Sequence, residues 1–231
     1  MTDSIKKFFS GFKRSDVIWF SVSTAVILAL NIYYGDSPVE IISALTGIWC
    51  VFLCGNGKLA CFIVGSINVL AYSYVAFHAH YYGDMLLNLL YYLPSNVVGF
   101  ILWSRNKNSE SGEVVGKRMS GKAIAITVPL AAAAVAVYGF ILGKKGGSLP
   151  YADSARTVFS ITAQILLLKR YSEQWLLCII GYGIAVGMWI YAFVSGSGTP
   201  AMLVMWIVNL INAVSAFIKW NRKISSDEKT K

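Results

Sequence analysis

Apolar runs of roughly 20 residues, long enough for a helix to cross the hydrocarbon of a bilayer, recur along most of this chain. Short segments that carry charged residues, glycine or proline separate them. Across the 231 residues, 56% of the side chains are hydrophobic, 13% are charged and the mean hydropathy is +0.60, which exceeds that of an ordinary soluble domain. Because hydrocarbon leaves backbone polar groups without water, runs of this length favour helices. The sequence therefore predicts an all-α integral membrane protein.

The breaks between the runs predict about eight transmembrane helices. We expect them over residues 17–34, 39–56, 59–80, 84–103, 121–142, 152–169, 175–195 and 201–220. The four cysteines lie in or beside these helices, where a free thiol behaves as a small hydrophobe. His78 and His80 are interpreted as interfacial polar residues at a helix end, and no metal or other cofactor is predicted.

Positively charged residues predict the orientation, because Lys and Arg are retained on the cytoplasmic side. With the N-terminus inside, seventeen of the twenty Lys and Arg residues fall on that side, the exceptions being Lys144, Lys145 and Arg156. Both termini are therefore predicted to be cytoplasmic, with the protein in the plasma membrane. The net charge of +9 follows from this bias and from attraction to anionic membrane lipid, and it requires no nucleic acid partner.

The second half of the chain contains a distant copy of the first. YSYVAF and LWSRN in the first half correspond to MWIYAF and IKWNRK in the second, which aligns Phe77 with Phe193 and Trp103 with Trp220. A helix between the copies lets both begin outside and finish inside, so the repeats are expected to be parallel. The predicted divisions are an N-terminal segment with the first helix (1–36), two three-helix repeats (37–106 and 149–222), a loop with a linker helix (107–148) and a cytoplasmic tail (223–231).

Amide side chains, whose exposure to lipid would be costly, recur inside the repeats together with aromatic side chains. At about 100° per residue, Asn88, Tyr92, Ser95 and Asn96 share one helix face. Amides can bond the edge of a planar ring or a sugar, and aromatic rings can stack on it, which favours a substrate cavity at the repeat interface. The alternative is a set of interhelical hydrogen bonds without a substrate role. The candidate binding residues are Trp49, Asn68, Asn88, Tyr92, Asn96, Gln164, Tyr182, Trp189, Asn209 and Asn212.

Other patterns limit the function. Three tryptophans near inner helix ends are expected in the aromatic belt at the membrane surface, namely Trp103, Trp175 and Trp220. GNGK over 55–58 is too short for an ATP-binding loop, and GYGIAVG over 181–187 lacks the dinucleotide-binding spacing. Apart from Asp84 and Asp153 near helix ends, no carboxylate is embedded where ion coupling would need one, and no catalytic arrangement suggests an enzyme.

Several longer motifs resemble the PnuC-type vitamin transporters, a family related to the SWEET proteins. They are VEIISALTG (39–47), GSIN (65–68), YYGDMLLNLLYYLPSNVVG (81–99), WSR (103–105), LPYADSARTVFSITAQILLLKRYSEQWLL (149–177) and MLVMW (202–206). The resemblance implies two three-helix bundles with a connecting helix, a homotrimer, and facilitated diffusion of nicotinamide riboside that intracellular phosphorylation then traps. It also implies pocket residues near Asn68, Asn88, Asn96, Gln164 and the helix over 175–195.

That last helix departs from the family pattern at Cys178 and Tyr182, and Asn96 stands where a longer Gln is usual. Deoxynucleosides, thiamine and riboflavin therefore stay open as substrates beside nicotinamide riboside. We predict a membrane transporter that mediates facilitated uptake of a nucleoside or vitamin of this kind. The competing interpretations are a non-transporting scaffold or sensor, whose polar residues only join helices, and a proton-coupled carrier.

Overall fold

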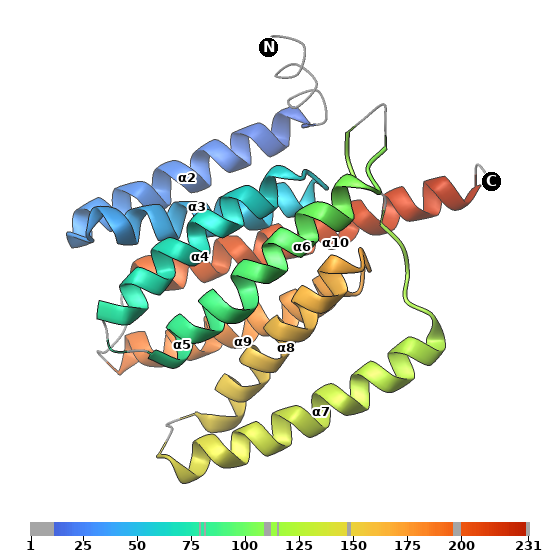
Figure 1. Ribbon diagram of the computed structural model, residues 1–231. Helices are drawn as coiled ribbons and strands as arrows, with labels where there is room; N and C mark the ends of the chain where they lie inside the picture. The colour runs from blue at the N-terminus through green and yellow to red at the C-terminus, as the bar shows by residue number, and fades with distance from the viewer. Residues whose placement is uncertain are drawn as a thin grey trace. The chain divides into compact units, whose positions relative to one another are not determined.

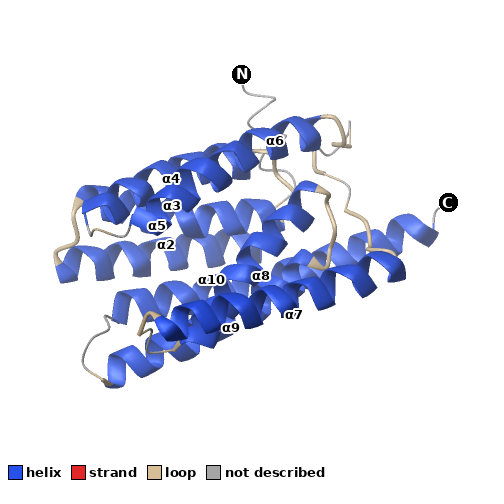
Figure 2. Cartoon of the chain, turned by 60° about the horizontal axis from the view of Figure 1, so that its bottom comes forward, coloured by secondary structure: helices blue, strands red, loops and turns tan. Residues whose placement is uncertain are grey.

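The computed structural model describes residues 12–78, 80, 82–108, 112–114, 116–146, 149–195 and 200–229. It is all-helical, as predicted (Figures 1 and 2), and outside the helices these residues form only two isolated β-bridges. The α-helices are α2 (Arg14–Tyr34), α3 (Pro38–Gly55), α4 (Ala60–His78), α5 (Tyr82–Leu87), α6 (Leu93–Ser104), α7 (Gly121–Lys144), α8 (Pro150–Leu168), α9 (Gln174–Val194) and α10 (Pro200–Lys229). A π-helical turn, η1 (Asn88–Tyr92), joins α5 to α6, so residues 82–104 form one helix.

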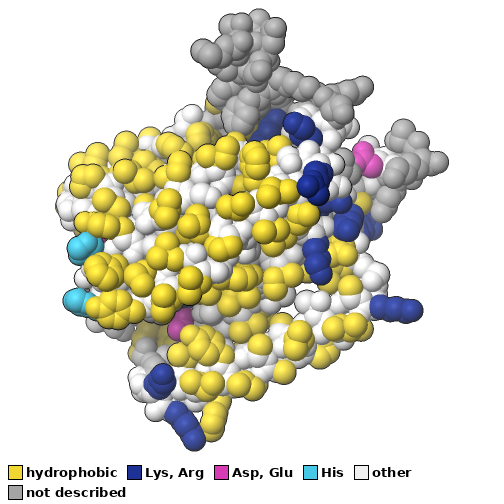
Figure 3. Space-filling view, viewed as in Figure 1, with side chains coloured by type: hydrophobic (Ala, Val, Ile, Leu, Met, Phe, Trp, Pro, Cys, Tyr) yellow, Lys and Arg dark blue, Asp and Glu magenta, His cyan; other side chains and the backbone are white. Residues whose placement is uncertain are grey.

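Within the described part of the chain, 7 helices are long and apolar enough to cross a membrane, with Asp84–Ser104 counted as one. The helix at the remaining predicted place, α8, has a comparable length but carries Asp153, Arg156 and Gln164, which lower its hydropathy. Hydrophobic side chains cover most of the face seen in Figure 3, and Lys and Arg side chains lie toward the helix ends. Lipid rather than water is the solvent that suits such a surface.

Helix ends lie within about three residues of the predicted ones, except at the end of the last helix. The last helix, α10, continues to Lys229 instead of ending at 220, because hydropathy marks where a span leaves the membrane and not where helical hydrogen bonding stops. The helix predicted over 59–80 ends at His78, and His80 has a left-handed backbone with φ of 60°. A residue with this backbone conformation interrupts an α-helix.

The helix predicted over 84–103 is not a regular α-helix. At the π-helical turn the Leu93 N–H donates to the carbonyl of Asn88, five residues earlier. Pro94 follows immediately, and it has no N–H to donate while its ring crowds the carbonyl four residues back. Proline therefore accounts for the looser turn at this point, and π turns of this kind are frequent at functional sites.

The chain divides into two compact units, Met1–Val115 and Gly116–Lys231. In the first unit α2 packs on α3, α3 on α4, and α4 on the helix formed by α5, η1 and α6. In the second unit α7 packs on α8, α8 on α9, and α9 on α10. In each unit, one helix therefore packs on the first helix of a predicted repeat, and α7, predicted as a linker, packs within the second unit.

The start of α3 is determined by local sequence. Gly35, with φ of 74°, ends α2, because glycine enters the left-handed region without strain. Ser37 then caps α3: its hydroxyl accepts from the Glu40 N–H at 3.4 Å, and its own N–H donates to the Glu40 carboxylate at 2.7 Å. Pro38 occupies the first helical position, where its missing N–H has no consequence.

The three tryptophans predicted in the aromatic belt are buried inside their units instead. Trp103 is 0% exposed and meets Phe62 edge to face, with ring centroids 4.9 Å apart. Trp175 and Trp220 form the same kind of pair at 6.0 Å. Each pair joins the beginning of one helix, α4 or α9, to the next long helix along the chain. These rings are buried within their units, so the belt prediction is wrong.

The segment at the boundary of the units, residues 112–114 and 116–119, which we call the connecting segment, bonds to one interhelical turn of each unit. In the first unit the Val114 N–H donates to the Gly57 carbonyl at 3.0 Å, within the turn between α3 and α4. In the second unit the Lys117 N–H donates to the Arg170 carbonyl, and the Ser172 N–H donates to the Lys117 carbonyl, both at 2.9 Å. The corresponding turns of the two repeats are therefore held by successive parts of one segment.

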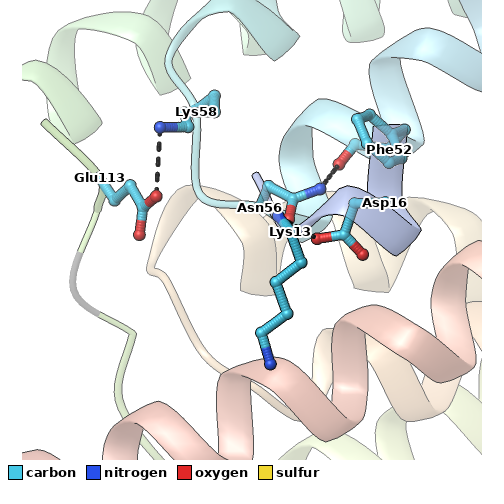
Figure 4. A network of polar contacts seen from close by, with 6 residues as sticks. All are labelled: Lys13, Asp16, Phe52, Asn56, Lys58 and Glu113. Carbon is cyan, nitrogen blue, oxygen red and sulfur yellow. Dashed lines mark hydrogen bonds and ion pairs between the residues drawn. The ribbon is translucent and has the colours of Figure 1, made fainter. Parts of the chain in front are cut away.

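An ion pair reinforces the first of these attachments (Figure 4). The Lys58 ammonium lies 3.1 Å from the Glu113 carboxylate, and the two side chains are 4% and 17% exposed. The ammonium also lies 5.2 Å from the centroid of the Phe12 ring. In the same turn, the Asn56 amide donates to the Phe52 carbonyl at 2.8 Å.

Candidate functional site

In the first unit, two predicted binding residues hold helices together. The Asn68 amide, on α4, donates to the Ser43 carbonyl of α3 at 2.7 Å. The Trp49 indole, on α3, donates to the Thr24 hydroxyl of α2 at 3.0 Å, and its ring lies 5.8 Å from that of Phe20. The N–H groups of both side chains therefore make hydrogen bonds between helices, which is the alternative to a substrate role given above.

The other predicted residues of this unit surround the π-helical turn. The Asn88 amide donates to the Asp84 carbonyl at 2.8 Å, so it satisfies a group of its own helix. Asn96 is buried beside α4, where a Cβ on Gly65 would lie 3.2 Å from its amide nitrogen. The prediction that these residues and Tyr92 share one helix face assumed regular α-helical spacing, which the π turn breaks. Their burial also differs, because Asn96 is buried whereas Asn88 and Tyr92 are half-buried.

In the second unit, side chains from α8, α9 and α10 converge on Trp206. Its ring and that of Tyr182, on α9, have centroids 5.7 Å apart. From α8, the Arg156 guanidinium lies 5.9 Å from the centroid of the Trp206 ring. The same guanidinium donates to the Asp153 carboxylate at 3.2 Å, one turn earlier on α8. We call Asp153, Arg156, Tyr182, Trp206 and Asn209 the Trp206 cluster.

Asn209 joins this cluster because it follows Trp206 by three residues and so shares its helix face. Among the residues that the structure describes, the Trp206 indole nitrogen and the Asn209 amide oxygen are buried without a hydrogen-bond partner. Asn209 is 6% exposed. Leaving such a group unpaired costs about 1–3 kcal/mol, and an indole N–H donates while an amide oxygen accepts. A ligand that offers both an acceptor and a donor would satisfy the pair.

The remaining predicted residues lie on the same three helices. Asn212 follows Asn209 by one turn on α10 and is 6% exposed. Trp189 follows Tyr182 by seven residues on α9, which places the two rings on one face, and it is half-buried. Gln164 is half-buried on α8. The prediction that these residues and those of the first unit meet in one cavity stays a prediction.

Sequence reasoning did not include Trp206 or Arg156 among the binding residues. In the sequence, Trp206 appears only as the last residue of the MLVMW motif, and Arg156 is one of the three positive charges outside the predicted cytoplasmic side. The spacing of Trp206 and Asn209 by three residues was the available signal, because it gives an aromatic ring and an amide one helix face.

The chain is similar to known transporters over nearly all its length. Residues 37–222 match the sequence profile of a family described as "Nicotinamide mononucleotide transporter". The nicotinamide riboside transporter PnuC of Neisseria mucosa is 31% identical over 224 residues, which cover 95% of this chain and 85% of that protein. The transporter of the same name from Haemophilus influenzae is 30% identical over 221 residues, covering 95% of both.

Structural comparison agrees with these sequence matches. The crystal structure of the vitamin B3 transporter PnuC superposes with a TM-score of 0.80 at 29% sequence identity. The superposition covers 96% of each chain. The chain therefore has the fold of a solved transporter.

Proposed function

The chain belongs to the nicotinamide mononucleotide transporter family, and on this premise we propose that it mediates facilitated diffusion of nicotinamide riboside across the plasma membrane. Relatives that are named nicotinamide riboside transporters support this choice of substrate. Phosphorylation of the substrate inside the cell would prevent its return and so drive net uptake. A deoxynucleoside, thiamine or riboflavin is the alternative cargo that the departures at Cys178 and Tyr182 keep open.

The Trp206 cluster carries the proposal. Nicotinamide riboside has a flat pyridinium ring, a carboxamide and a ribose. The Trp206 and Tyr182 rings offer aromatic faces for the pyridinium, and aromatic faces attract cations. The unpartnered Trp206 N–H and Asn209 oxygen match the carboxamide or a ribose hydroxyl, each of which both donates and accepts.

Two further properties belong to this proposal. Both termini are cytoplasmic, as the distribution of Lys and Arg supports. The protein functions as a homotrimer, which the family resemblance implies. Cross-linking of the purified protein in lipid tests the trimer, and labelling of single cysteines introduced near each terminus tests the orientation, because an impermeant reagent would leave both unlabelled in sealed cells.

A binding screen by titration calorimetry tests the substrate. The purified protein is titrated with nicotinamide riboside, thiamine, riboflavin and several deoxynucleosides. We expect saturable binding of nicotinamide riboside. Binding of one of the others, with none of nicotinamide riboside, would contradict the proposed substrate and assign the cluster to that compound.

Substitution of Asn209 separates a binding role from helix packing. Asn209→Ala removes the unpartnered acceptor, and we expect it to weaken nicotinamide riboside binding about tenfold, a typical effect of losing one buried hydrogen bond to a ligand. Asn221→Ala is the matched control on the same helix, because the Asn221 amide bonds the Phe217 carbonyl of its own helix. Unchanged affinity in Asn209→Ala, together with loss of the assembled protein on size-exclusion chromatography, would favour the scaffold interpretation.

A further inference from the structure

Arg156 occupies the aromatic face that a cationic substrate would use. Its guanidinium carbon lies 5.9 Å from the centroid of the Trp206 ring, within the range of a cation–π interaction. The Asp153 carboxylate holds the guanidinium at 3.2 Å, and the two side chains are 40% and 35% exposed, so the pair is half-buried with room to move. The unpartnered Trp206 N–H and Asn209 oxygen belong to the same cluster.

Two cations compete for one ring face. The pyridinium of nicotinamide riboside carries a permanent positive charge, and it would be attracted to Trp206 for the same electrostatic reason as the guanidinium is. The two like charges repel at close range, and this repulsion is strong where water is partly excluded. Binding of the pyridinium on Trp206 therefore requires Arg156 to leave the ring, while Asp153 remains available to neutralise one positive charge.

From this geometry we propose that Arg156 is a resident cation that the substrate displaces from Trp206, so that the Asp153–Arg156 pair determines how strongly the protein prefers a cationic to a neutral substrate. The inference rests on nicotinamide riboside as the substrate, and it assigns the pair a role in specificity. Arg156 opposes binding of a cation through competition and repulsion. Asp153 favours it because its negative charge offsets the charge of Arg156 and attracts the cationic ring.

The two members of the pair therefore have opposite expected effects. Arg156→Gln removes the competing cation and leaves the Asp153 carboxylate, so affinity for the cationic substrate rises. Asp153→Asn leaves an uncompensated cation beside Trp206, so that affinity falls. Reduced nicotinamide riboside, the dihydropyridine form, has nearly the same shape and no charge. Its affinity should change much less in both variants.

The experiment measures the dissociation constants of both forms by calorimetry for wild type, Arg156→Gln and Asp153→Asn. We expect the preference for the oxidised over the reduced form to increase about threefold to tenfold in Arg156→Gln and to decrease by a similar factor in Asp153→Asn, as a cation–π and charge effect of ordinary size would give. Lys144→Gln is the matched control. Lys144 lies 4.6 Å from the Phe140 ring on α7, in the same unit but outside the cluster, and its loss should leave the preference unchanged.

The outcomes distinguish this inference from the function on which it rests. If wild type does not bind nicotinamide riboside, the proposed function fails and this inference fails with it. If wild type binds but both forms change in parallel in the two variants, the pair acts only on structure and the inference alone is overturned. Weaker binding of the oxidised form in Arg156→Gln would also overturn it, because Arg156 would then be a direct ligand. Asp153→Asn provides an independent test of the sign if Arg156→Gln does not assemble.

Discussion

Gly139 allows α7 to pack against α8. A Cβ at this position would overlap the ring of Tyr151, which lies directly against the glycine. One turn along the contact, the buried Ser154 hydroxyl donates to the Val135 carbonyl of α7 at 2.8 Å. Without water in the membrane, close packing and hydrogen bonds of this kind hold helices together, so the missing side chain at Gly139 is a structural requirement.

Gly139→Ala should therefore weaken the contact between α7 and α8. The methyl group forces the Tyr151 ring or the helix to move, and overpacking of this kind costs roughly 1–3 kcal/mol. Thermal unfolding in detergent measures the loss. Gly143→Ala is the matched control on the same helix, since its Cβ would make only an ordinary contact of 3.7 Å with Pro150. Equal stability of the two variants would refute the role of Gly139.

Asp36 should make the stability of the folded protein depend on pH, and the direction of its pKa shift gives the sign. Burial, and next the neighbouring Glu40 carboxylate, raise the pKa of Asp36 above 3.8 in the loop between α2 and α3. The ionised form is therefore disfavoured in the folded protein, which loses stability as the pH rises through the folded-state pKa. Asp36→Asn should raise the melting temperature slightly at neutral pH, and its advantage should vanish well below pH 3.8. An advantage that persists at low pH would contradict this electrostatic cause.

The connecting segment attaches to the first unit through the Lys58–Glu113 ion pair. Because the Lys58 side chain is 4% exposed, removal of the Glu113 charge leaves a buried ammonium without the carboxylate that balances it. Glu113→Gln should therefore destabilise the protein by roughly 3 kcal/mol, measured as a lower melting temperature. The double variant Lys58→Met, Glu113→Leu should recover most of this loss, since it buries no charge. No loss in the single variant would show that the pair does not hold the connecting segment.

Helix positions were largely predictable because their signals are local. Proline and capping residues begin α3, glycine ends α2, and apolar length finds the spans. The π-helical turn at Asn88–Tyr92 was not predictable from hydropathy, because one residue of shifted register leaves the average apolarity unchanged. The burial of Trp103 was missed for a related reason: a tryptophan near a helix end has the same sequence signal whether it faces lipid or packs on Phe62.

The candidate site was predictable only in part. Asn209 was identified because an amide in a membrane helix needs a partner, whereas Asn68, identified by the same argument, bonds to Ser43 of a neighbouring helix. Sequence alone does not distinguish these outcomes, since they depend on which helices pack together. Arg156 was missed because its aromatic partner, Trp206, lies on another helix.

Each unit bonds its own part of the connecting segment at one interhelical turn, between α3 and α4 in the first unit and between α8 and α9 in the second, which agrees with the predicted repeats. This agreement, together with the family to which the chain belongs, supports a carrier in which the repeats provide alternating access. A carrier of this kind needs no energy source for passage itself. Its direction should follow the substrate gradient alone.

Uptake of labelled nicotinamide riboside into liposomes that contain only the purified protein tests this account most directly. The account predicts saturable entry, faster than into empty liposomes, that stops when the inside and outside concentrations are equal and does not change when a proton gradient is dissipated. Asn209→Ala should slow entry at low substrate concentration, and Asn221→Ala should not. Accumulation above the outside concentration, or entry no faster than into empty liposomes, would contradict facilitated diffusion of this substrate.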